Sequence, residues 1–306
     1  MDSVPKPSII VTGSNGLIGS KFVSEAKHDF TIVPADINSD SNPIDITNRS
    51  QVFELIESTQ PTAVVHFAAF TNVTAAWEQS GDKTGPAYLV NVVGTQNIVE
   101  ACEQFGVHLI HISTAYVFDG TKKDMYVESD TPNPIEWYGQ TKAEAEAIVL
   151  NSDCASTVFR IDQPFRSDDF ARHDVVRRIV KGMLTDSLYP QFTDHFFAPT
   201  YIDDFAATLR WAILEKASGI YHCTTNSMVS DFEFATHIQQ QLEIEYEIKK
   251  TTLAEYLKTT SRPYQQNTAL NSDTLLHDSK LELLSLPKAL SNVVIDLDAL
   301  ANDATQ

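Results

Sequence analysis

The chain has 306 residues, of which 42% are hydrophobic and 21% are charged, and its formal net charge is −19 at pH 7. This length allows about two domains, or one large α/β unit with an appended lobe. The acidity, with no basic run to offset it, argues against a nucleic-acid partner or an anionic membrane surface. No signal peptide and no run approaching ~20 apolar residues is evident. The three cysteines show neither disulfide nor metal spacing, so we expect a soluble cytoplasmic protein without a metal site.

Short apolar runs alternate with helical patterns through the first half of the chain. The runs that indicate buried strands are SIIVTG, FTIVPAD, AVVHFAA, HLIHIST and STVFRI. Helical patterns lie between them, at roughly residues 15–28, 48–59, 86–105 and 137–151. This alternation predicts an α/β fold with a doubly wound parallel sheet of Rossmann type.

The first strand run breaks into glycines at Gly13, Gly16 and Gly19. Gly13 can turn tightly without a Cβ clash, Gly16 would let a pyrophosphate approach, and Gly19 would let the next helix pack on the sheet. The amides at the start of that helix would then point at the phosphates. The spacing G-x-x-G-x-x-G differs from the usual dinucleotide fingerprint, so a glycine-rich turn without a ligand is the alternative.

Two acidic positions follow the second strand run. Asp36 ends this run, where a carboxylate can accept hydrogen bonds from the adenosine ribose and would repel a 2′-phosphate, which favours NAD over NADP. Asp45 could meet the adenine amino group while Ile46 packs on the ring. Alternatively, Asp36 is a loop acid, and Asp45 is an acid near a helix that Thr47 or Asn48 caps.

A hydroxyl, a tyrosine and a lysine suggest carbonyl chemistry. Ser113 and Thr114 stand at the C-terminal end of a predicted strand, the edge where open α/β sheets bind ligands. Tyr138 and Lys142 are four residues apart on a predicted helix and share one face. Such a set suits hydride transfer, in which Tyr138 gives or takes the proton and Thr114 bonds the reacting oxygen. Lys142 and an oxidised nicotinamide would lower the pKa of Tyr138, although this pair of residue types is also common on helix surfaces.

Together with these residues, several motifs resemble those of the extended short-chain dehydrogenases/reductases. They occur in the order of that family from residue 8 to about 206: TGSNGLIG, Asp36, DI at 45–46, HFAAFTNV, NVVGTQNIVEAC, ISTAYVFDG, ESDTPNPIEWYGQTKAEAE and PTYIDDFA. STAYVFDG, APTYIDDFA and SRPYQQNTALNSDTL are similar to motifs of the dTDP-4-dehydrorhamnose reductase branch. The resemblance implies an NAD(P)H-dependent reductase of a nucleotide-linked 4-keto-6-deoxy sugar.

The resemblance also assigns roles to individual positions. Catalysis would fall to Thr114, Tyr138 and Lys142. The cofactor, NAD with NADP as the alternative, would contact Gly13, Ser14, Asn15, Gly16, Leu17, Ile18, Asp36, Asp45, Ile46, Ala68, Ala69, Phe70, Asn91, Ser113, Tyr138 and Lys142. The substrate would contact Thr71, Ala115, Tyr116, Arg166 and Arg262. Arg262 is either a ligand of the substrate diphosphate, which guanidinium groups suit, or a surface arginine. Arg166 could supply contacts to the substrate or be a solvated loop residue.

Three features depart from the reductase branch and keep other functions open. Ala115 replaces the acid that follows the catalytic hydroxyl, RIDQPFR lacks the aromatic residues expected to pack on a sugar, and the insert WEQSGDKTGPAYLVN differs from the reductase pattern. Alanine after the hydroxyl is compatible with a sugar-nucleotide 4-epimerase, whereas Ala115 and Tyr116 make a 4,6-dehydratase a poor match. A non-catalytic NAD(P)-binding protein like the methionine adenosyltransferase beta subunit is the further alternative.

The chain therefore divides into two expected parts. Residues 1–165 would form the NAD(P)-binding domain, with a returning segment near 195–215, and residues 166–306 would form mainly a substrate-binding lobe of short helices and loops. Residues 301–306 are expected to be disordered.

Two further expectations concern particular side chains. His66, His108 and His111 are expected in the core or at its rim. Members of the family often dimerise through the helix that carries Tyr138, so the resemblance allows a homodimer. The apolar stripe along that helix, through Ala143, Ala147, Val149 and Leu150, could equally be buried against its own sheet.

Overall fold

The computed structural model describes residues 6–39 and 43–303 of the chain, which forms two compact units. Unit 1 takes in residues 1–117, 132–160 and 206–221, and unit 2 takes in residues 118–131, 161–205 and 222–306. Each unit is therefore assembled from separate stretches of the sequence.

Unit 1 is built on a six-stranded sheet with the strand order β2-β1-β3-β4-β5-β8, in which β1 to β4 pair in parallel. Its strands are β1 Ser8–Thr12, β2 Thr31–Ala35, β3 Ala63–His66, β4 His108–Thr114, β5 Ser156–Ile161 and β8 Gly219–His222. Its helical elements are α1 Leu17–Ala26, α2 Arg49–Thr59, α3 Val73–Trp77, α4 Pro86–Tyr88, η1 Leu89–Gly94, α5 Thr95–Phe105, η2 Ala115–Val117, α6 Trp137–Leu150 and, from Ala206 onward, α8 Ile202–Glu215.

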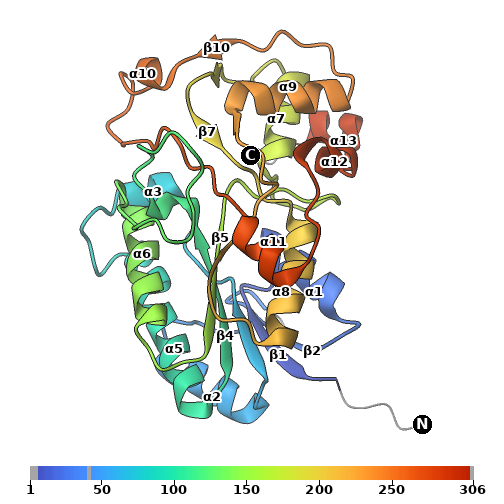
Figure 1. The fold of residues 1–306 in the computed structure, drawn as a ribbon. Helices are drawn as coiled ribbons and strands as arrows, with labels where there is room; N and C mark the ends of the chain where they lie inside the picture. Colours follow the sequence, from blue (N-terminus) through green and yellow to red (C-terminus); the bar gives the residue numbers. More distant parts are fainter. Residues whose placement is uncertain (1–5, 40–42, 304–306) are drawn as a thin grey trace. The chain divides into compact units, whose positions relative to one another are not determined.

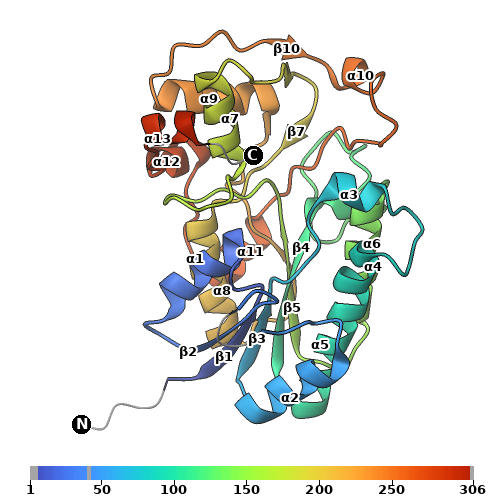
Figure 2. The same ribbon diagram turned by 180° about the vertical axis from the view of Figure 1, so that it is seen from behind.

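Helices cover both faces of this sheet, as Figures 1 and 2 show. Helices α2, α5 and α6 lie on one face, where Ile56, Ile98 and Val149 pack against strand residues such as Val64. Helices α1 and α8 lie on the other face. The predicted doubly wound Rossmann fold is confirmed.

The sequence pattern located most of unit 1 and missed parts that follow residue 165. All five predicted strands are present, whereas the short sixth strand β8 was not predicted. The predicted helix over 86–105 consists of α4, the π-helix η1 and α5. The expectation of only short helices beyond 165 was wrong, because α8 has 14 residues. Its buried residues Phe205, Leu209 and Ala212 recur at helical spacing, which the preceding loop-like sequence obscured.

Unit 2 is organised around a second apolar core. Phe165, Phe197 and Phe234 are fully or almost fully buried in it. Its strands form two small sheets, β6 with β10 and β7 with β9. Its elements are α7 Val175–Leu184, β6 Gln191–Phe192, β7 Phe196–Phe197, β9 Val229–Ser230, α9 Asp231–Gln241, β10 Lys250–Thr251, α10 Leu253–Tyr256, α11 Asp273–Ser279, α12 Leu286–Ser291 and α13 Leu297–Asn302. The disorder predicted for 301–306 is wrong for residues 301 and 302, which end α13, and residues 304–306 lie outside the described residues.

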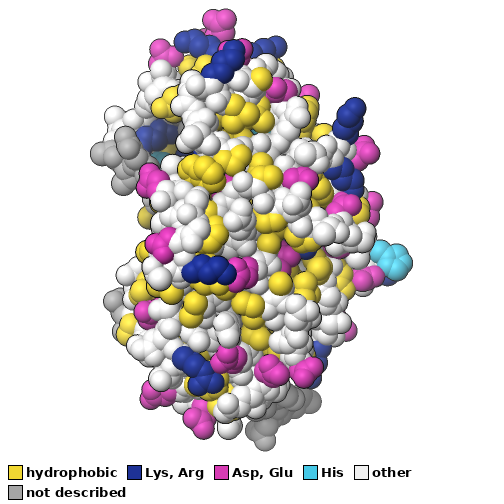
Figure 3. Space-filling view, turned by 90° about the vertical axis from the view of Figure 1, so that its left-hand side faces the viewer, with side chains coloured by type: hydrophobic (Ala, Val, Ile, Leu, Met, Phe, Trp, Pro, Cys, Tyr) yellow, Lys and Arg dark blue, Asp and Glu magenta, His cyan; other side chains and the backbone are white. Residues whose placement is uncertain are grey.

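The outer side of unit 1 bears on the expected homodimer. Val149 is buried against the sheet, whereas Leu150 is 44% exposed and Ala147 is also exposed. Figure 3 looks onto the side that carries α5 and α6 and shows hydrophobic side chains dispersed among charged ones. Dimerisation stays a prediction.

Among the described residues, no helix combines the length and apolarity needed to cross a membrane.

A buried ion pair joins α6 to β5. The Arg160 guanidinium donates to both carboxylate oxygens of Glu146, with an Nη2–Oε2 distance of 2.7 Å and an Nε–Oε1 distance of 3.0 Å. The two side chains are 1% and 2% exposed. Buried charges of this kind are stable together, but either one alone is strongly disfavoured.

This pair leads to a prediction about stability. We expect Arg160→Met to lower the free energy of unfolding by about 3–5 kcal/mol, because it leaves the Glu146 carboxylate buried without its partner. Adding Glu146→Leu should recover much of that loss, since both charges are then absent. Urea denaturation of both single variants and the double variant measures the coupling. A double variant that loses as much as the two single variants summed would contradict this account.

Candidate active site

The hydroxyl, tyrosine and lysine predicted as catalytic lie together in unit 1. Thr114 is the last residue of β4, and its hydroxyl makes a hydrogen bond with Tyr138 near the start of α6. Lys142 lies one turn further along α6. All three are buried, with exposures of 8% for Thr114, 8% for Tyr138 and 3% for Lys142. Helix α6 packs against β4, so these positions meet although 24 residues separate Thr114 from Tyr138.

A buried carboxylate fixes where α6 begins. Glu136 is 0% exposed and caps the helix by accepting hydrogen bonds from the amides of Tyr138, at 2.8 Å, and Gly139, at 2.6 Å. A Cβ at Gly139 would overlap the carbonyl oxygen of Tyr116, so only glycine lets this turn approach the segment after β4 so closely. Neither residue was predicted from the sequence. Glutamate is not among the usual N-cap residues, although the YG pair was a readable signal for a close approach.

The phenol of Tyr138 is held in its protonated form. Burial raises the pKa of Tyr138 above its ordinary value, the hydrogen bond with Thr114 lowers it, and the Glu136 carboxylate raises it further. This direction is opposite to the lowering expected from the sequence. The main physical reason is the burial of the phenol, which disfavours its charged form. The Lys142 ammonium donates to the carbonyl oxygen of Ile112 in β4, at 2.7 Å. A protonated phenol is the form that can give a proton to a carbonyl oxygen.

Lys142 is itself perturbed by its surroundings. Burial lowers its pKa to about 8, and the nearby Glu146 carboxylate opposes that shift. His66 and His111 lie on the neighbouring strands β3 and β4, and burial lowers the pKa of His66 to about 3 and that of His111 well below its usual value. Both are therefore neutral near pH 7. The expectation that His66, His108 and His111 belong to the core or its rim is confirmed, with exposures of 2%, 6% and 0%.

The glycine-rich loop links β1 to α1. Gly13 has a φ of +65°, and a Cβ there would lie 2.6 Å from the amide nitrogen of Ala68 after β3. A Cβ at Gly19 would overlap the carbonyl oxygen of Gly13, so this glycine lets α1 pack on the loop itself, whereas the sequence analysis expected it to pack on the sheet. Gly16 is exposed at the start of α1, where no side chain caps the helix, and Asn15 is also exposed. Such a helix start suits the phosphates of a dinucleotide.

The residues predicted to contact adenosine lie in two places: Asp36 follows β2, and Asp45 and Ile46 precede α2. The Asp36 carboxylate accepts from the amides of Asn15 and Asn38, each at 3.1 Å, and so ties the end of β2 to the glycine-rich loop. Asp45 instead accepts from the amide and hydroxyl of Thr47, at 2.9 and 2.7 Å. Ile46 is only 5% exposed within the core, which leaves little of its side chain for an adenine ring. The cap of α2 is Asn48, one of the two residues suggested for that role.

Asn91 organises the loop after β3. It lies in the π-helix η1, is 1% exposed, and brackets Phe70 by accepting from its amide at 2.8 Å and donating to its carbonyl at 3.1 Å. Its amide nitrogen also donates to the Thr141 hydroxyl in α6 at 2.9 Å. Asn91 thus holds the loop rather than presenting a free group to a ligand. Ala68, Ala69 and Phe70 are half-buried in this loop, and Thr71 is exposed.

Two serine hydroxyls test whether these residues fit a dinucleotide. Ser14 in the glycine-rich loop and Ser113 in β4 are 4% and 3% exposed. Neither hydroxyl oxygen has a hydrogen-bond partner among the described residues. Buried polar groups ordinarily have partners, so these two hydroxyls, at predicted cofactor positions, fit a site completed by a polar ligand. The glycine-rich loop and the helix start of α1 agree with a dinucleotide there.

The predicted substrate residues after Thr114 differ in exposure. The Ala115 methyl group is fully buried, so its contact with a substrate stays a prediction. Tyr116 is half-buried, and its ring meets that of Tyr138 edge-on, with centroids 5.8 Å apart.

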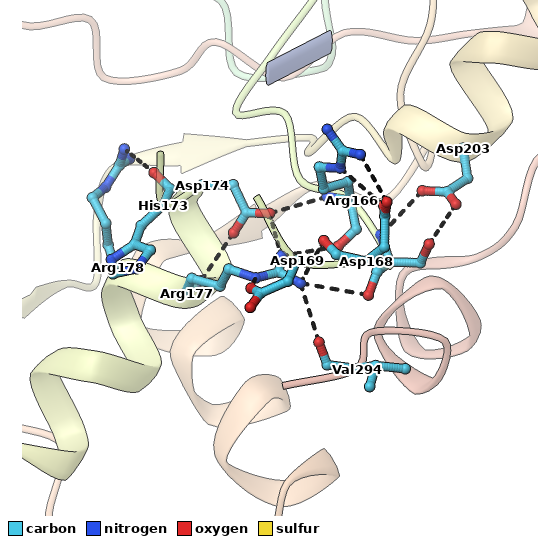
Figure 4. A network of polar contacts seen from close by, with 10 residues as sticks. Arg166, Asp168, Asp169, His173, Asp174, Arg177, Arg178, Asp203 and Val294 are labelled. Carbon is cyan, nitrogen blue, oxygen red and sulfur yellow. Dashed lines mark hydrogen bonds and ion pairs between the residues drawn. The ribbon is translucent and has the colours of Figure 1, made fainter. Parts of the chain in front are cut away.

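Unit 2 carries the two predicted arginines. Arg166 is 4% exposed and not a solvated loop residue, because its guanidinium pairs with Asp168 through bonds of 2.9 and 2.8 Å. Figure 4 shows that Arg177, which the sequence analysis missed, anchors this segment. Arg177 is 1% exposed, and it binds Asp174 at 2.7 Å and the carbonyl oxygen of Asp168 at 2.7 Å. Arg166 and Arg177 therefore hold the loop after β5 in shape.

Arg262 has a different environment. It is 7% exposed, so it is not a surface arginine, and its guanidinium lies 3.8 Å from the centroid of the Tyr264 ring. Its buried Nη1 has no hydrogen-bond partner among the described residues. A buried guanidinium with an unused donor fits the recognition of an anionic ligand.

Fold and site together define a Rossmann-type dinucleotide-binding protein with a tyrosine and a lysine at the carboxyl edge of the sheet. Known proteins are similar to this chain in sequence and in fold. The chain is 28% identical over 302 residues to the dTDP-4-dehydrorhamnose reductase of Aggregatibacter actinomycetemcomitans. This match covers 93% of the present chain and 97% of the relative. It is 26% identical over 273 residues to methionine adenosyltransferase 2 subunit beta of Xenopus tropicalis, with 86% and 80% covered. The crystal structure of dTDP-4-dehydrorhamnose reductase from Bacillus anthracis in complex with NADP matches with a TM-score of 0.83 at 25% identity, covering 93% of this chain and 97% of that one.

Residues 7–298 match the sequence family described as the RmlD substrate binding domain. The chain belongs to this family. The resemblance inferred from the motifs is thereby confirmed.

The perturbed lysine gives a prediction about pH. The folded protein favours the ammonium of Lys142 less than the unfolded chain does, because burial lowers its pKa from 10.5 to about 8. Between about pH 8 and pH 10 the unfolded chain therefore binds more protons at this residue. The free energy of unfolding of the wild type should rise with pH over that range, relative to Lys142→Met. Below pH 8 the difference between the two proteins should be constant.

Urea denaturation of both proteins at several pH values measures this difference. Lys83→Met is the matched control, because the Lys83 side chain is 61% exposed and its pKa is raised rather than lowered. A difference between wild type and Lys142→Met that does not change between pH 8 and pH 10 would show that Lys142 is not held in a desolvated site.

Proposed function

We propose that this protein is an NAD(P)H-dependent reductase of a nucleotide-linked 4-keto-6-deoxy sugar, like the dTDP-4-dehydrorhamnose reductases of its family. The family and the names of its relatives agree with the oxidoreductase class and with the NAD(P) cofactor expected from the sequence. The observation that carries the proposal is the convergence of Thr114, Tyr138 and Lys142 at the end of β4. The buried hydroxyl of the neighbouring Ser113 has no hydrogen-bond partner among the described residues, so it is available to a ligand.

The proposed reaction adds a hydride and a proton to a ketone. The reduced nicotinamide supplies the hydride when it is bound. Tyr138 gives its phenolic proton to the ketone oxygen at C4, so that the carbonyl becomes a secondary alcohol, and Thr114 bonds the same oxygen. The phenolate that remains on Tyr138 takes a proton from water, and Lys142, whose ammonium donates to the Ile112 carbonyl oxygen, would contact the cofactor. Because reduction begins from the protonated phenol, the raised pKa of Tyr138 suits this direction.

Unit 2 would provide the substrate contacts. Arg262 is the best candidate for the diphosphate of a nucleotide sugar, because its guanidinium is buried and one of its donors is unused. Arg166 is a weaker candidate, since its bidentate pair with Asp168 already satisfies much of its charge. The division of labour between residues 1–165 and 166–306 is part of this proposal.

The two alternatives make different demands on the same residues. A 4-epimerase would use Tyr138 and Lys142 without consuming reduced cofactor. A regulatory protein, suggested by the likeness to methionine adenosyltransferase 2 subunit beta, would bind the cofactor without turnover. The hydrogen bond between Thr114 and Tyr138 supports an enzyme rather than a binding protein, and the names of the relatives support the reductase.

The reductase proposal predicts the behaviour of Tyr138→Phe. Wild-type protein should oxidise reduced nicotinamide in the presence of a nucleotide-linked 4-keto-6-deoxy sugar, beginning with the dTDP form, as loss of the nicotinamide absorbance. Tyr138→Phe should lose about 10²–10⁴-fold in kcat, because it removes the proton donor but keeps the ring in place. Cofactor binding by both proteins, measured by calorimetry, is the control for folding. Tight binding by the wild type without turnover on any sugar of the panel would contradict the proposal.

The end of β2 predicts the choice of cofactor. No lysine or arginine occurs between Asp36 and Asp45, so this segment offers no cation for a 2′-phosphate, and the Asp36 carboxylate would repel it. We expect wild-type protein to prefer NADH, and Asp36→Asn to lower the NADH/NADPH ratio of kcat/KM by roughly tenfold, about 1.4 kcal/mol. Asparagine keeps one oxygen acceptor for the amide of Asn15. Steady-state rates with both cofactors decide the matter, and an equal or greater preference for NADH in the variant would count against the role of Asp36.

A further inference from the structure

Glu136 caps the start of α6, although capping a helix does not require a buried carboxylate. Glu136 is 0% exposed, and its oxygens accept from the amides of Tyr138, at 2.8 Å, and Gly139, at 2.6 Å. Shorter side chains such as serine, threonine, aspartate and asparagine satisfy helix amides more often, and a buried charge carries a cost of desolvation that a neutral cap avoids. The need for capping alone therefore does not explain a fully buried carboxylate two residues before the tyrosine.

We propose that Glu136 is a positioning residue that fixes the Tyr138 ring beside Thr114 and keeps its phenol in the proton-donating form. The inference rests on the proposed reductase function, in which Tyr138 supplies the proton.

The positioning part follows from the packing of the first turn of α6. Glu136 holds the backbone of Tyr138 itself, so any movement of the cap moves the residue that carries the phenol. The same turn also lies so close to the Tyr116 carbonyl oxygen that a Cβ on Gly139 would overlap it. The turn is thus bonded to the Glu136 carboxylate and also lies against the segment that follows β4. That segment begins directly after Thr114, the hydrogen-bond partner of Tyr138.

The electrostatic part follows from the charges around the ring. A carboxylate near the ring disfavours the phenolate, because two negative charges would then face each other in a buried site. Burial and the Glu136 carboxylate both raise the pKa of Tyr138, and the Thr114 hydroxyl lowers it. The elements packed against α6 are β4, η1, η2 and α3 to α5, β5 adds Arg160 through its pair with Glu146, and α6 adds acids and a lysine of its own. Their titratable groups are His108, His111, Tyr116, Tyr88, Glu100, Cys102, Glu103, Lys142, Glu144 and Glu146.

Three variants separate the charge of Glu136 from its shape. Glu136→Gln keeps the size and one oxygen acceptor but removes the charge, and Glu136→Asp keeps the charge but shortens the reach. Glu144→Gln is the matched control, because it removes a partly exposed carboxylate from the same helix. The rate of ketone reduction is measured against pH for each protein. In parallel, tyrosine labelled with ¹³C at Cζ reports the ionisation of Tyr138 by NMR, with the signal assigned from Tyr138→Phe.

The proposal expects the alkaline limb of kcat/KM to move to lower pH by about one unit in Glu136→Gln. The Tyr138 signal should begin to titrate at correspondingly lower pH. Glu136→Asp should lose part of kcat through misplacement but keep the wild-type pH profile, and Glu144→Gln should match the wild type. A Glu136→Gln protein whose rate falls equally at every pH, with unchanged titration of Tyr138, would overturn the electrostatic role.

The NMR titration also separates this inference from the proposed function. It needs no substrate, so a lowered titration of Tyr138 in Glu136→Gln would support the role of Glu136 even if no sugar of the panel were reduced. Unchanged titration in a protein that does reduce the sugar would refute the inference and leave the reductase function standing.

Discussion

The contact on which the candidate site depends is the one between the first turn of α6 and the end of β4. The sheet places Thr114 at the carboxyl edge of β4, but the phenol that it bonds comes from a helix 24 residues later. Glu136 caps that helix, Gly139 allows it to lie against the Tyr116 carbonyl, and Thr114 bonds Tyr138.

Buried polar groups behind this turn hold the rest of unit 1 in register with it. Asn91 bridges the loop after β3 to Thr141 in α6, so the loop that would face a cofactor and the helix that carries the tyrosine share one side chain. Almost three turns after Glu136, the pair of Glu146 and Arg160 joins α6 to β5. These interactions carry a desolvation cost, and they specify a single arrangement because any other would leave their polar groups unpaired.

The sequence predicted the parts of the molecule that rest on local patterns. Apolar runs located β1 to β5, and the spacing of Tyr138 and Lys142 put them on one face of α6. The sequence could not show which partners the side chains bind, or how deeply they are buried, once distant segments of the chain come together. Asp45 and Ile46 were predicted to touch adenine, and this contact stays a prediction, but the sequence did not show that Asp45 bonds Thr47 or that Ile46 is buried in the core. The direction of the Tyr138 pKa depended on how deeply the phenol is buried and on the nearby Glu136 carboxylate, which the spacing of Tyr138 and Lys142 does not reveal.

The central claim is that a hydride from the cofactor ends on the ketone carbon. It is tested most directly by supplying reduced nicotinamide with deuterium at its transferable position and analysing the sugar by mass spectrometry and NMR. The account predicts one deuterium at C4 of the product for each cofactor oxidised, and almost none with Tyr138→Phe over the same time. A sugar that changes configuration without gaining deuterium, or a cofactor that stays reduced beside every substrate, would contradict it.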